Sequence, residues 1–214
     1  MSSTYSVVAG TINGVVAVRG RSGLVLQQPK TFRRAISPAQ AESMARMKQA
    51  GLAWNELSPA SVAAWRAYAA GLTHRNNVTG QRFAPVAFNV FSGLFCKLLQ
   101  MDPAAPVPVY PPQTIFFGDD LTVTVASTDE GVVYTASAPN QPGVLTEILY
   151  QRLPGPHRLP KPAYKSAGFA SFQADSLSFT LLLDPGPYAC AYQFVEASTG
   201  RTTLTMPLGT VTIS

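Results

Sequence analysis

The chain has little charge, few cysteines and few histidines, and each shortage narrows the classes of protein to which it can belong. Charged residues make up 13% of the 214 residues, about half of the usual share. The two cysteines, Cys96 and Cys190, are too few for a disulfide framework, so we expect free thiols. His74 and His157 lie in no cluster with ligand spacing, so we expect no metal site and no cofactor.

Long apolar runs are missing as well. None approaches the roughly 20 residues that span a membrane, so we expect no membrane partner. Gly10, Asn13 and Gly14 interrupt the apolar start, which also lacks a preceding basic region, so we expect no secretion signal. Hydrophobic residues nonetheless make up 46% of the chain, which is ample for a core. Such a chain, rich in apolar residues and poor in charge, favours assembly with partners that cover part of its surface.

No catalytic pattern stands out in the sequence. His157 lies in the proline-rich stretch 154–162, which is typical of a protruding loop rather than of a base beside a nucleophile. Asp119 and Asp120 are adjacent, and adjacent side chains of a strand point to opposite faces. The glycine-rich stretches near residues 10–14 and 20–23 lack the Gly-Lys-Ser/Thr that would hold phosphate. We therefore expect neither an enzyme nor a small-molecule substrate.

The charge that is present is distributed unevenly. Residues 1–101 have a formal net charge of +9 and residues 102–214 one of −4, and no acidic residue precedes Glu42. We expect residues 1–36 to form an extended basic arm with short strands, because their valine runs are broken by glycine and asparagine. Its candidate partner-binding residues are Arg19, Arg21, Lys30, Arg33 and Arg34.

Residues 37–101 predict a helical domain. Ser37-Pro38 and Ser58-Pro59 are helix starts, with Ser as the cap and Pro at the first helical position. The first helix is predicted to run to about Glu56 and the second to about Gly71, and a third, with a broad apolar face, spans about 85–101. Trp54 and Trp65 are expected in the core of a small bundle.

Residues 102–114 predict a semi-rigid extended linker, because residues 102–112 contain five prolines. Residues 115–214 then have the pattern of about seven short strands separated by turns, which is typical of an immunoglobulin-like sandwich. The predicted strands are 121–126, 132–138, 145–151, 169–173, 178–183, 188–196 and 204–213. The whole chain is therefore predicted to be α+β in two parts.

One local motif supports the sandwich. Asp184, Gly186, Tyr188 and Cys190 form D-x-G-x-Y-x-C, which resembles the corner before strand F of immunoglobulin-type domains. The resemblance implies a Tyr hydroxyl that bonds to upstream backbone. The partner cysteine is missing, because the early strand has Val133 and Tyr134 at the corresponding place. The motif implies the fold and no immune function.

The order of segments also resembles a family. The chain has Ser37-Pro38-Ala39-Gln40, then Trp54-x-x-Leu57-Ser58, then Phe88-Asn89-Val90-Phe91, then the proline-rich segment and the strands. This order is similar to that of uncharacterised structural proteins of tailed bacteriophages and prophages. The resemblance implies a non-enzymatic virion protein that is assembled in the host cytoplasm.

As such a protein it would be a capsid decoration or cement protein, or one of the neck or tail. Its expected partners are major capsid or neck and tail proteins and copies of itself, with the arm and helices as anchor and the sandwich displayed. Two alternatives stay open. One is an architectural DNA-binding protein that uses the basic arm, with nucleic acid as the weaker partner. The other is a carbohydrate-binding or adhesive β-module.

Overall fold

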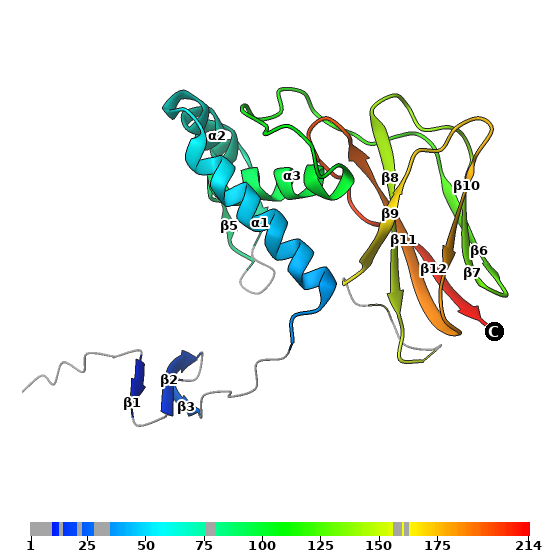
Figure 1. Ribbon diagram of the computed structural model, residues 1–214, viewed down its shortest axis with the longest axis horizontal. Helices are drawn as coiled ribbons and strands as arrows, with labels where there is room; N and C mark the ends of the chain where they lie inside the picture. The colour runs from blue at the N-terminus through cyan, green and yellow to red at the C-terminus, as the bar shows by residue number, and fades with distance from the viewer. Residues whose placement is uncertain are drawn as a thin grey trace, which may run out of the picture. The chain divides into compact units, whose positions relative to one another are not determined.

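The chain has a mixed α+β fold with helices and antiparallel sheets (Figure 1). The computed structural model describes residues 10–12, 15–20, 23–27, 35–75, 80–155, 160 and 163–214. The chain divides into two compact units, Met1–Ala41 and Glu42–Ser214. The α+β class predicted from the sequence is therefore confirmed.

The first unit contains a small antiparallel sheet in the order β1-β2-β3. Its strands are β1 (Gly10–Ile12), β2 (Val15–Gly20) and β3 (Gly23–Gln27). The central strand β2 pairs Ala17 with Gly10 on one side and with Leu26 on the other. These strands bond to one another within the small sheet.

The described part of the chain has three helices, and the first two begin at the caps predicted from the sequence. They are α1 (Pro38–Glu56), α2 (Pro59–Gly71) and α3 (Ala87–Met101). At α1 the Ser37 backbone N–H donates to Gln40 Oε1 at 3.0 Å, and the Gln40 N–H donates to Ser37 Oγ at 3.3 Å. This reciprocal pair is a capping box. At α2, Ser58 Oγ accepts the Ser61 N–H at 3.1 Å. A small hairpin of β4 (His74–Arg75) and β5 (Arg82–Phe83), which was not predicted, lies between α2 and α3.

The helices share one core built around Trp65. Its ring is fully buried and meets the Phe91 ring edge-on, with centroids 5.3 Å apart. Trp54 is half-buried and packs against Phe91 at 5.2 Å and Phe88 at 5.9 Å. Small alanines of α1 and α2, such as Ala53 and Ala69, let the helices approach these aromatic rings. The predicted aromatic core is thus present.

The C-terminal half of the second unit consists of strands that match the seven predicted runs, within the described residues. They are β6 (Val123–Thr128), β7 (Gly131–Ala136), β8 (Val144–Arg152), β9 (Lys165–Ala170), β10 (Ser178–Leu182), β11 (Gly186–Glu196) and β12 (Met206–Ile213). They form antiparallel sheets in the orders β10-β7-β6 and β12-β11-β8-β9. The main boundary error is β9, which lies about four residues earlier than predicted.

Both of these sheets contribute to one apolar core. Val132 and Tyr134 of β7, and Ile148 of β8, are fully buried in it, as is Cys190 of β11. The buried Tyr134 hydroxyl donates to the Leu149 carbonyl at 3.0 Å. At the start of β11, the Tyr188 hydroxyl donates to the Asp184 carbonyl at 2.9 Å. This is the bond to upstream backbone that the sequence motif implied.

The proline-rich segment differs from the spacer expected from its composition. Pro111 is buried, and the Pro108 carbonyl accepts the Trp65 Nε1–H at 3.3 Å. Residues 42–214 form one compact unit without a boundary at 102–114. The prolines do exclude helix and sheet here, but an extended segment can also lie against apolar side chains, and this one covers the helix core.

Two buried titratable groups of the strand core, the Cys190 thiol and the Tyr134 hydroxyl, predict that the protein loses stability at alkaline pH. Burial raises the pKa of the Cys190 thiol above its ordinary 9.0 and that of the Tyr134 hydroxyl above 10.0. The folded chain therefore holds these protons more tightly than the unfolded chain does. Their stabilisation is complete below pH 9 and is lost as the pH rises through the raised pKa values.

We expect urea unfolding at pH 8 to 11 to show this loss, with up to about 1.4 kcal/mol per pH unit for each group. The control is Cys190→Ala, which removes the thiol. It should reduce the dependence of the unfolding free energy on pH between pH 9 and 11. Parallel curves for the two proteins would contradict the role of the thiol.

Candidate functional site

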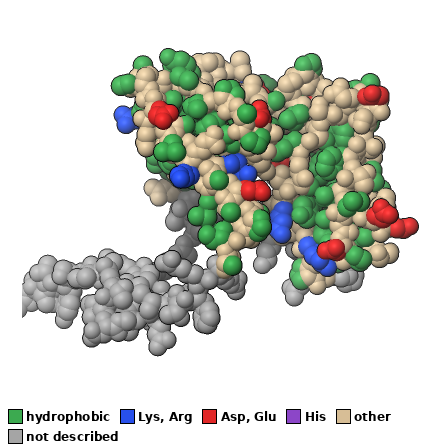
Figure 2. All heavy atoms as spheres, in the orientation of Figure 1, with side chains coloured by type: hydrophobic (Ala, Val, Ile, Leu, Met, Phe, Trp, Pro, Cys, Tyr) green, Lys and Arg blue, Asp and Glu red, His purple; other side chains and the backbone are tan. Residues whose placement is uncertain are grey.

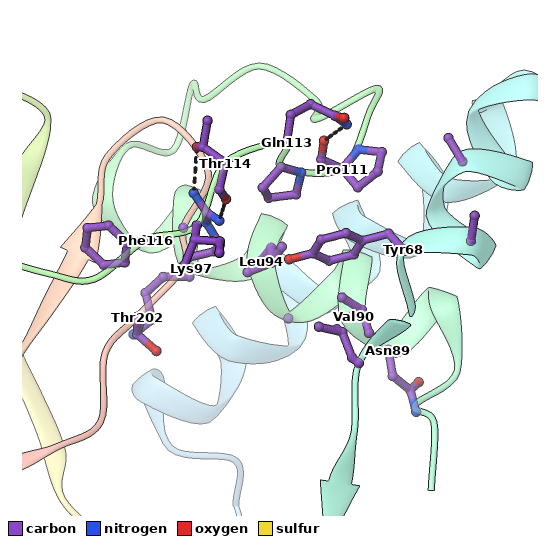
Figure 3. Close-up of a pocket in the computed structure, with 18 of the residues that line it drawn as sticks. Tyr68, Asn89, Val90, Leu94, Lys97, Pro111, Gln113, Thr114, Phe116 and Thr202 are labelled. Atoms are coloured by element: carbon purple, nitrogen blue, oxygen red, sulfur yellow. Dashed lines mark hydrogen bonds between the residues drawn. The ribbon is translucent and has the colours of Figure 1, made fainter. Parts of the chain in front are cut away.

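A cleft lies in the second unit where α2 and α3 meet the proline-rich segment and the β11–β12 turn (Figure 3). Its volume is about 1060 Å³. Tyr68 of α2 and Val90 and Leu94 of α3 form its apolar wall in Figure 3, and Gln113 and Thr114 lie across from them. Neither the cleft nor its lining was predicted from the sequence.

Arg201 anchors the far wall of the cleft. Its guanidinium donates to Glu196 Oε2 at 2.7 Å and to the Thr114 hydroxyl at 3.3 Å, and it also bonds the Thr114 carbonyl. The same group lies 6.0 Å from the Phe116 ring centroid. Gln113 Nε2 donates to the Pro111 carbonyl at 2.8 Å. These contacts hold residues 111–116 against the β11–β12 turn, so the wall of the cleft is fixed by its own hydrogen bonds.

Gly200 lets the β11–β12 turn approach α3 closely. Its φ is +73°, and a Cβ built there would lie 2.4 Å from the Leu94 carbonyl oxygen. A side chain at this position would therefore meet both the left-handed backbone penalty and a backbone clash. The floor of the cleft depends on this contact between the turn and the helix.

A buried ion pair joins α3 to the β12-β11-β8-β9 sheet beside the cleft. Lys97 Nζ lies 2.9 Å from both carboxylate oxygens of Glu147 on β8, whose side chain is 1% exposed. Gln193 Nε2 of β11 donates to the same carboxylate at 2.6 Å. Lys97 also donates to Gln100 Oε1 at 3.1 Å. Because a buried carboxylate needs compensation, this cluster locks the helix onto the sheet.

The cleft is lined mainly by apolar and uncharged polar side chains. Among the described residues that line it are many apolar side chains, amides and threonine hydroxyls, and no carboxylate or thiol. Its cations, Lys97 and Arg201, are already paired with Glu147 and Glu196. His74 is exposed at the rim, where it meets the Phe83 ring at 6.0 Å. No group of three metal-ligating side chains occurs in the part of the chain that the structure describes.

The arm residues predicted to bind a partner lie outside what the structure describes, apart from the backbone of Arg19 in β2. His157 is also outside the described residues. Asp119 holds a turn, because its carboxylate accepts the Gln141 N–H at 2.8 Å and the Asn140 side-chain amide at 3.2 Å. Asp119 and Asp120 both precede β6 in the chain.

Two groups of apolar side chains are exposed on the surface of the chain. On α1, every residue from Ser37 to Gln49 except Arg46 is exposed, including Met44 and Met47. We call residues 37–49 the exposed part of α1. A second group, on the segment beside the cleft, includes Tyr110, Ile115 and Phe117, the last of which is 86% exposed. Exposed apolar side chains of this kind are candidates for contact with another molecule.

None of the helices in the described ranges is both long and apolar enough to cross a membrane. No protein-family model, curated protein sequence or solved structure matches the chain.

Proposed function

We propose that the chain is a non-enzymatic structural protein of a tailed-bacteriophage virion, such as a capsid decoration, neck or tail-associated protein. The exposed part of α1 carries this proposal. A helix of a single globular domain normally buries one apolar stripe, yet Met44 and Met47 are 60% and 49% exposed. The geometry fits a helix whose apolar side chains are covered by a neighbouring subunit in an assembly.

An immunoglobulin-like sandwich is the finer fold that we propose for residues 115–214. If β6 to β12 are read as strands A, B, C, C′, E, F and G, the sheets have the orders E-B-A and G-F-C-C′. Immunoglobulin domains place strands A, B and E in one sheet and C, F and G in the other, and variable-type domains add C′ to the latter. The Tyr188 bond to the Asp184 carbonyl supports the same assignment, because it lies at the corner before strand F.

In this assignment, Tyr134 and Cys190 occupy the positions of the two cysteines that form the inter-sheet disulfide of antibody domains. Tyr134 belongs to β7, at strand B, and Cys190 to β11, at strand F, and both are fully buried. The Tyr134 hydroxyl reaches across to the Leu149 carbonyl of the opposite sheet. A hydrogen bond from an aromatic side chain thus joins the sheets without oxidation, which suits folding in a reducing cytoplasm.

In this proposal the extended basic arm, residues 1–36, attaches the chain to neighbouring subunits. Its excess of positive charge and the negative charge of residues 102–214 favour contact with acidic surfaces of neighbouring subunits. On a repeating lattice, many such contacts add to a stable attachment although each is weak.

The test uses particles of a phage that encodes this chain. We expect the chain in gradient-purified particles, and Met44→Glu/Met47→Glu should lower its incorporation about tenfold, because two carboxylates would have to be desolvated. The matched control is Ala60→Glu/Ala63→Glu, which adds the same charge with the same spacing at exposed positions of α2.

Mass spectrometry of the particles measures both variants against the wild type. Intact particles that lack the chain would contradict the virion role. Equal incorporation of the methionine variant would contradict the role of α1. Retention that disappears on nuclease treatment would favour the DNA-binding alternative.

A further inference from the structure

The strand β10 is a sheet edge, and no other strand of the described residues pairs with its outer side. Where it meets β7, the Leu177 carbonyl accepts the Ala136 N–H at 2.8 Å, and the Leu183 N–H donates to the Glu130 carbonyl at 3.2 Å. The direction of such bonds alternates along an antiparallel strand, so the odd-numbered residues of this strand bond to β7. The even-numbered residues therefore direct their backbone N–H and C=O groups outward. These residues are Ser178, Thr180 and Leu182.

The edge formed by β10 lacks the features that block pairing with a further strand, which are prolines, lysines and bulges. Its residues 178–182 contain no charge, proline or glycine, and their pairing with β7 is continuous. By contrast, β12 contains Pro207 and a bulge at Leu208, and β9 contains Lys165 and a bulge at Ala167. The opposite edge of the three-stranded sheet, β6, lies beside β12 (Figure 1). Among the described strands of these two sheets, β10 is therefore the edge best suited to accept another strand.

The side chains of β10 determine what kind of strand can continue the sheet. Phe179 and Leu181 are half-buried and pack against the core that the two sheets share. Ser178, Thr180 and Leu182 lie on the outer face and are exposed, Leu182 by 66%. An added strand must therefore offer apolar side chains toward the core and uncharged ones on the outer face. The sequence of β10 itself has this pattern.

A second copy of β10 fits this edge best in one register. A twofold axis perpendicular to the sheet makes the two strands antiparallel and keeps the core-facing side chains of both copies on the same side. The outward backbone groups then meet only where an even-numbered residue lies opposite another even-numbered residue. Among the registers that obey this condition, only the one with the axis at Thr180 pairs all five residues of the strand.

The charges near the ends of β10 do not oppose the approach of a second copy. After the strand, Glu130 and Asp184 share a pocket of about 560 Å³ with the cations Arg152 and Lys165. Arg152 lies 3.8 Å from the Asp184 carboxylate, and Figure 2 shows basic and acidic side chains next to each other at the lower end of the strands. Before the strand, Asp175 lies in a turn and does not continue the edge.

We propose that β10 pairs with β10 of a second copy of this chain about a twofold axis at Thr180, so that the three-stranded sheets of the two copies join into one sheet. Ser178 of each copy then lies opposite Leu182 of the other, and their outward backbone groups bond across the interface. Phe179 lies opposite Leu181 on the core side, and such apolar cross-strand pairs stabilise a sheet. Both copies use the same surface, as a twofold interface requires. The inference goes beyond the proposed virion role and does not depend on it.

Charges placed on the axis test the proposal in solution. We expect sedimentation velocity of the full-length chain to show a concentration-dependent dimer. Thr180→Lys and Thr180→Asp should each weaken it by about tenfold or more, because two like charges would lie opposite each other. An equimolar mixture of the two variants should associate again, since Lys then lies opposite Asp. Thr124→Lys is the matched control, because Thr124 is exposed on the same sheet face at the far strand, β6. A wild-type chain that stays monomeric up to about 1 mM, or Thr180 variants that associate as the wild type does, would overturn the proposal.

A disulfide trap tests the register. Thr180→Cys chains should cross-link to each other, because the Cα atoms of a hydrogen-bonded antiparallel pair lie about 5.5 Å apart. Ser178→Cys is the matched control on the same face, since its two copies would be four positions out of register, about 13 Å along the strand. Mixed with Leu182→Cys, it should link, and the wild type treated alike accounts for links through Cys96. A 178–178 link as abundant as the 180–180 link, or no 180–180 link in associated protein, would overturn the proposal. Neither result depends on incorporation into particles, so the virion role is tested separately.

Discussion

Replacing Lys97 by methionine is expected to lower the free energy of unfolding by about 3–5 kcal/mol. Methionine keeps most of the volume of the lysine stem but leaves Glu147 without its cation, and that side chain is 1% exposed. The amide of Gln193 would still donate at 2.6 Å, but one neutral donor does not balance a buried charge. Chemical denaturation, followed by both far-ultraviolet circular dichroism and tryptophan fluorescence, measures the loss.

The double variant Lys97→Met/Glu147→Leu separates the charge from the packing. We expect it to recover most of the lost stability, because a buried ion pair can often be replaced by apolar residues at little cost. Lys48→Met is the surface control, since Lys48 is exposed on α1, and it should change stability by about 0.5 kcal/mol or less. A single variant as stable as the wild type would show that Glu147 finds compensation elsewhere.

Replacing Trp65 by alanine is the second change with a large expected effect, also about 3–5 kcal/mol. The ring is fully buried between α2 and α3, where it contacts Phe91 and Tyr68 at centroid distances of 5.3 and 6.0 Å. The substitution also removes the hydrogen bond to the Pro108 carbonyl. We therefore expect faster amide hydrogen exchange in residues 109 and 110, next to Pro108, as well as a lower midpoint of unfolding.

Trp65→Phe distinguishes packing from the hydrogen bond. It keeps an aromatic ring against Phe91 and loses the indole N–H, so we expect a cost of about 1–2 kcal/mol with a similar rise in exchange at residues 109 and 110. If exchange rises in the alanine variant alone, packing of the ring, rather than the hydrogen bond, holds the segment in place. Unchanged exchange in both variants would contradict the proposed anchoring by Trp65.

Both variants test whether the second unit, residues 42–214, unfolds cooperatively. Lys97 joins α3 to the sheet, and Trp65 joins the helix core to the proline-rich segment. If residues 42–214 unfold as one unit, both variants should shift a single transition, detected alike by both signals. The cleft walls meet at these contacts, so its shape depends on the same cooperativity.

Much of the secondary structure could be predicted because its signals are local. Ser37-Pro38 and Ser58-Pro59 set the helix starts through side-chain oxygens that satisfy free backbone N–H groups one turn ahead. The strands β6 to β12 follow runs of β-branched and aromatic residues between turn residues. The predicted boundaries of β9 were wrong, because Ser166, Ala167 and Gly168 have little strand preference, and Ser166 and Gly168 pair with β8 through tertiary contact.

The candidate site could not be predicted, because its contacts join residues far apart in the chain. Lys97 and Glu147 are 50 positions apart, and Arg201 and Thr114 are 87 apart. A proline-rich composition excludes helix and sheet, but it does not say whether the extended segment is free or packed. The hydrogen bond from Trp65 to the Pro108 carbonyl shows that the segment is packed. A bond between residues so far apart in the chain has no local signature in the sequence.

The sequence by itself determined the helices, the strands of the two larger sheets and the separation of basic from acidic residues, since each depends on neighbours within a turn or a strand. Tertiary structure alone decided that the helices and sheets form one unit, that the proline-rich segment closes a cleft, and that β10 is an unprotected edge. The physical reason is that burial, ion pairing and strand order depend on which distant segments meet.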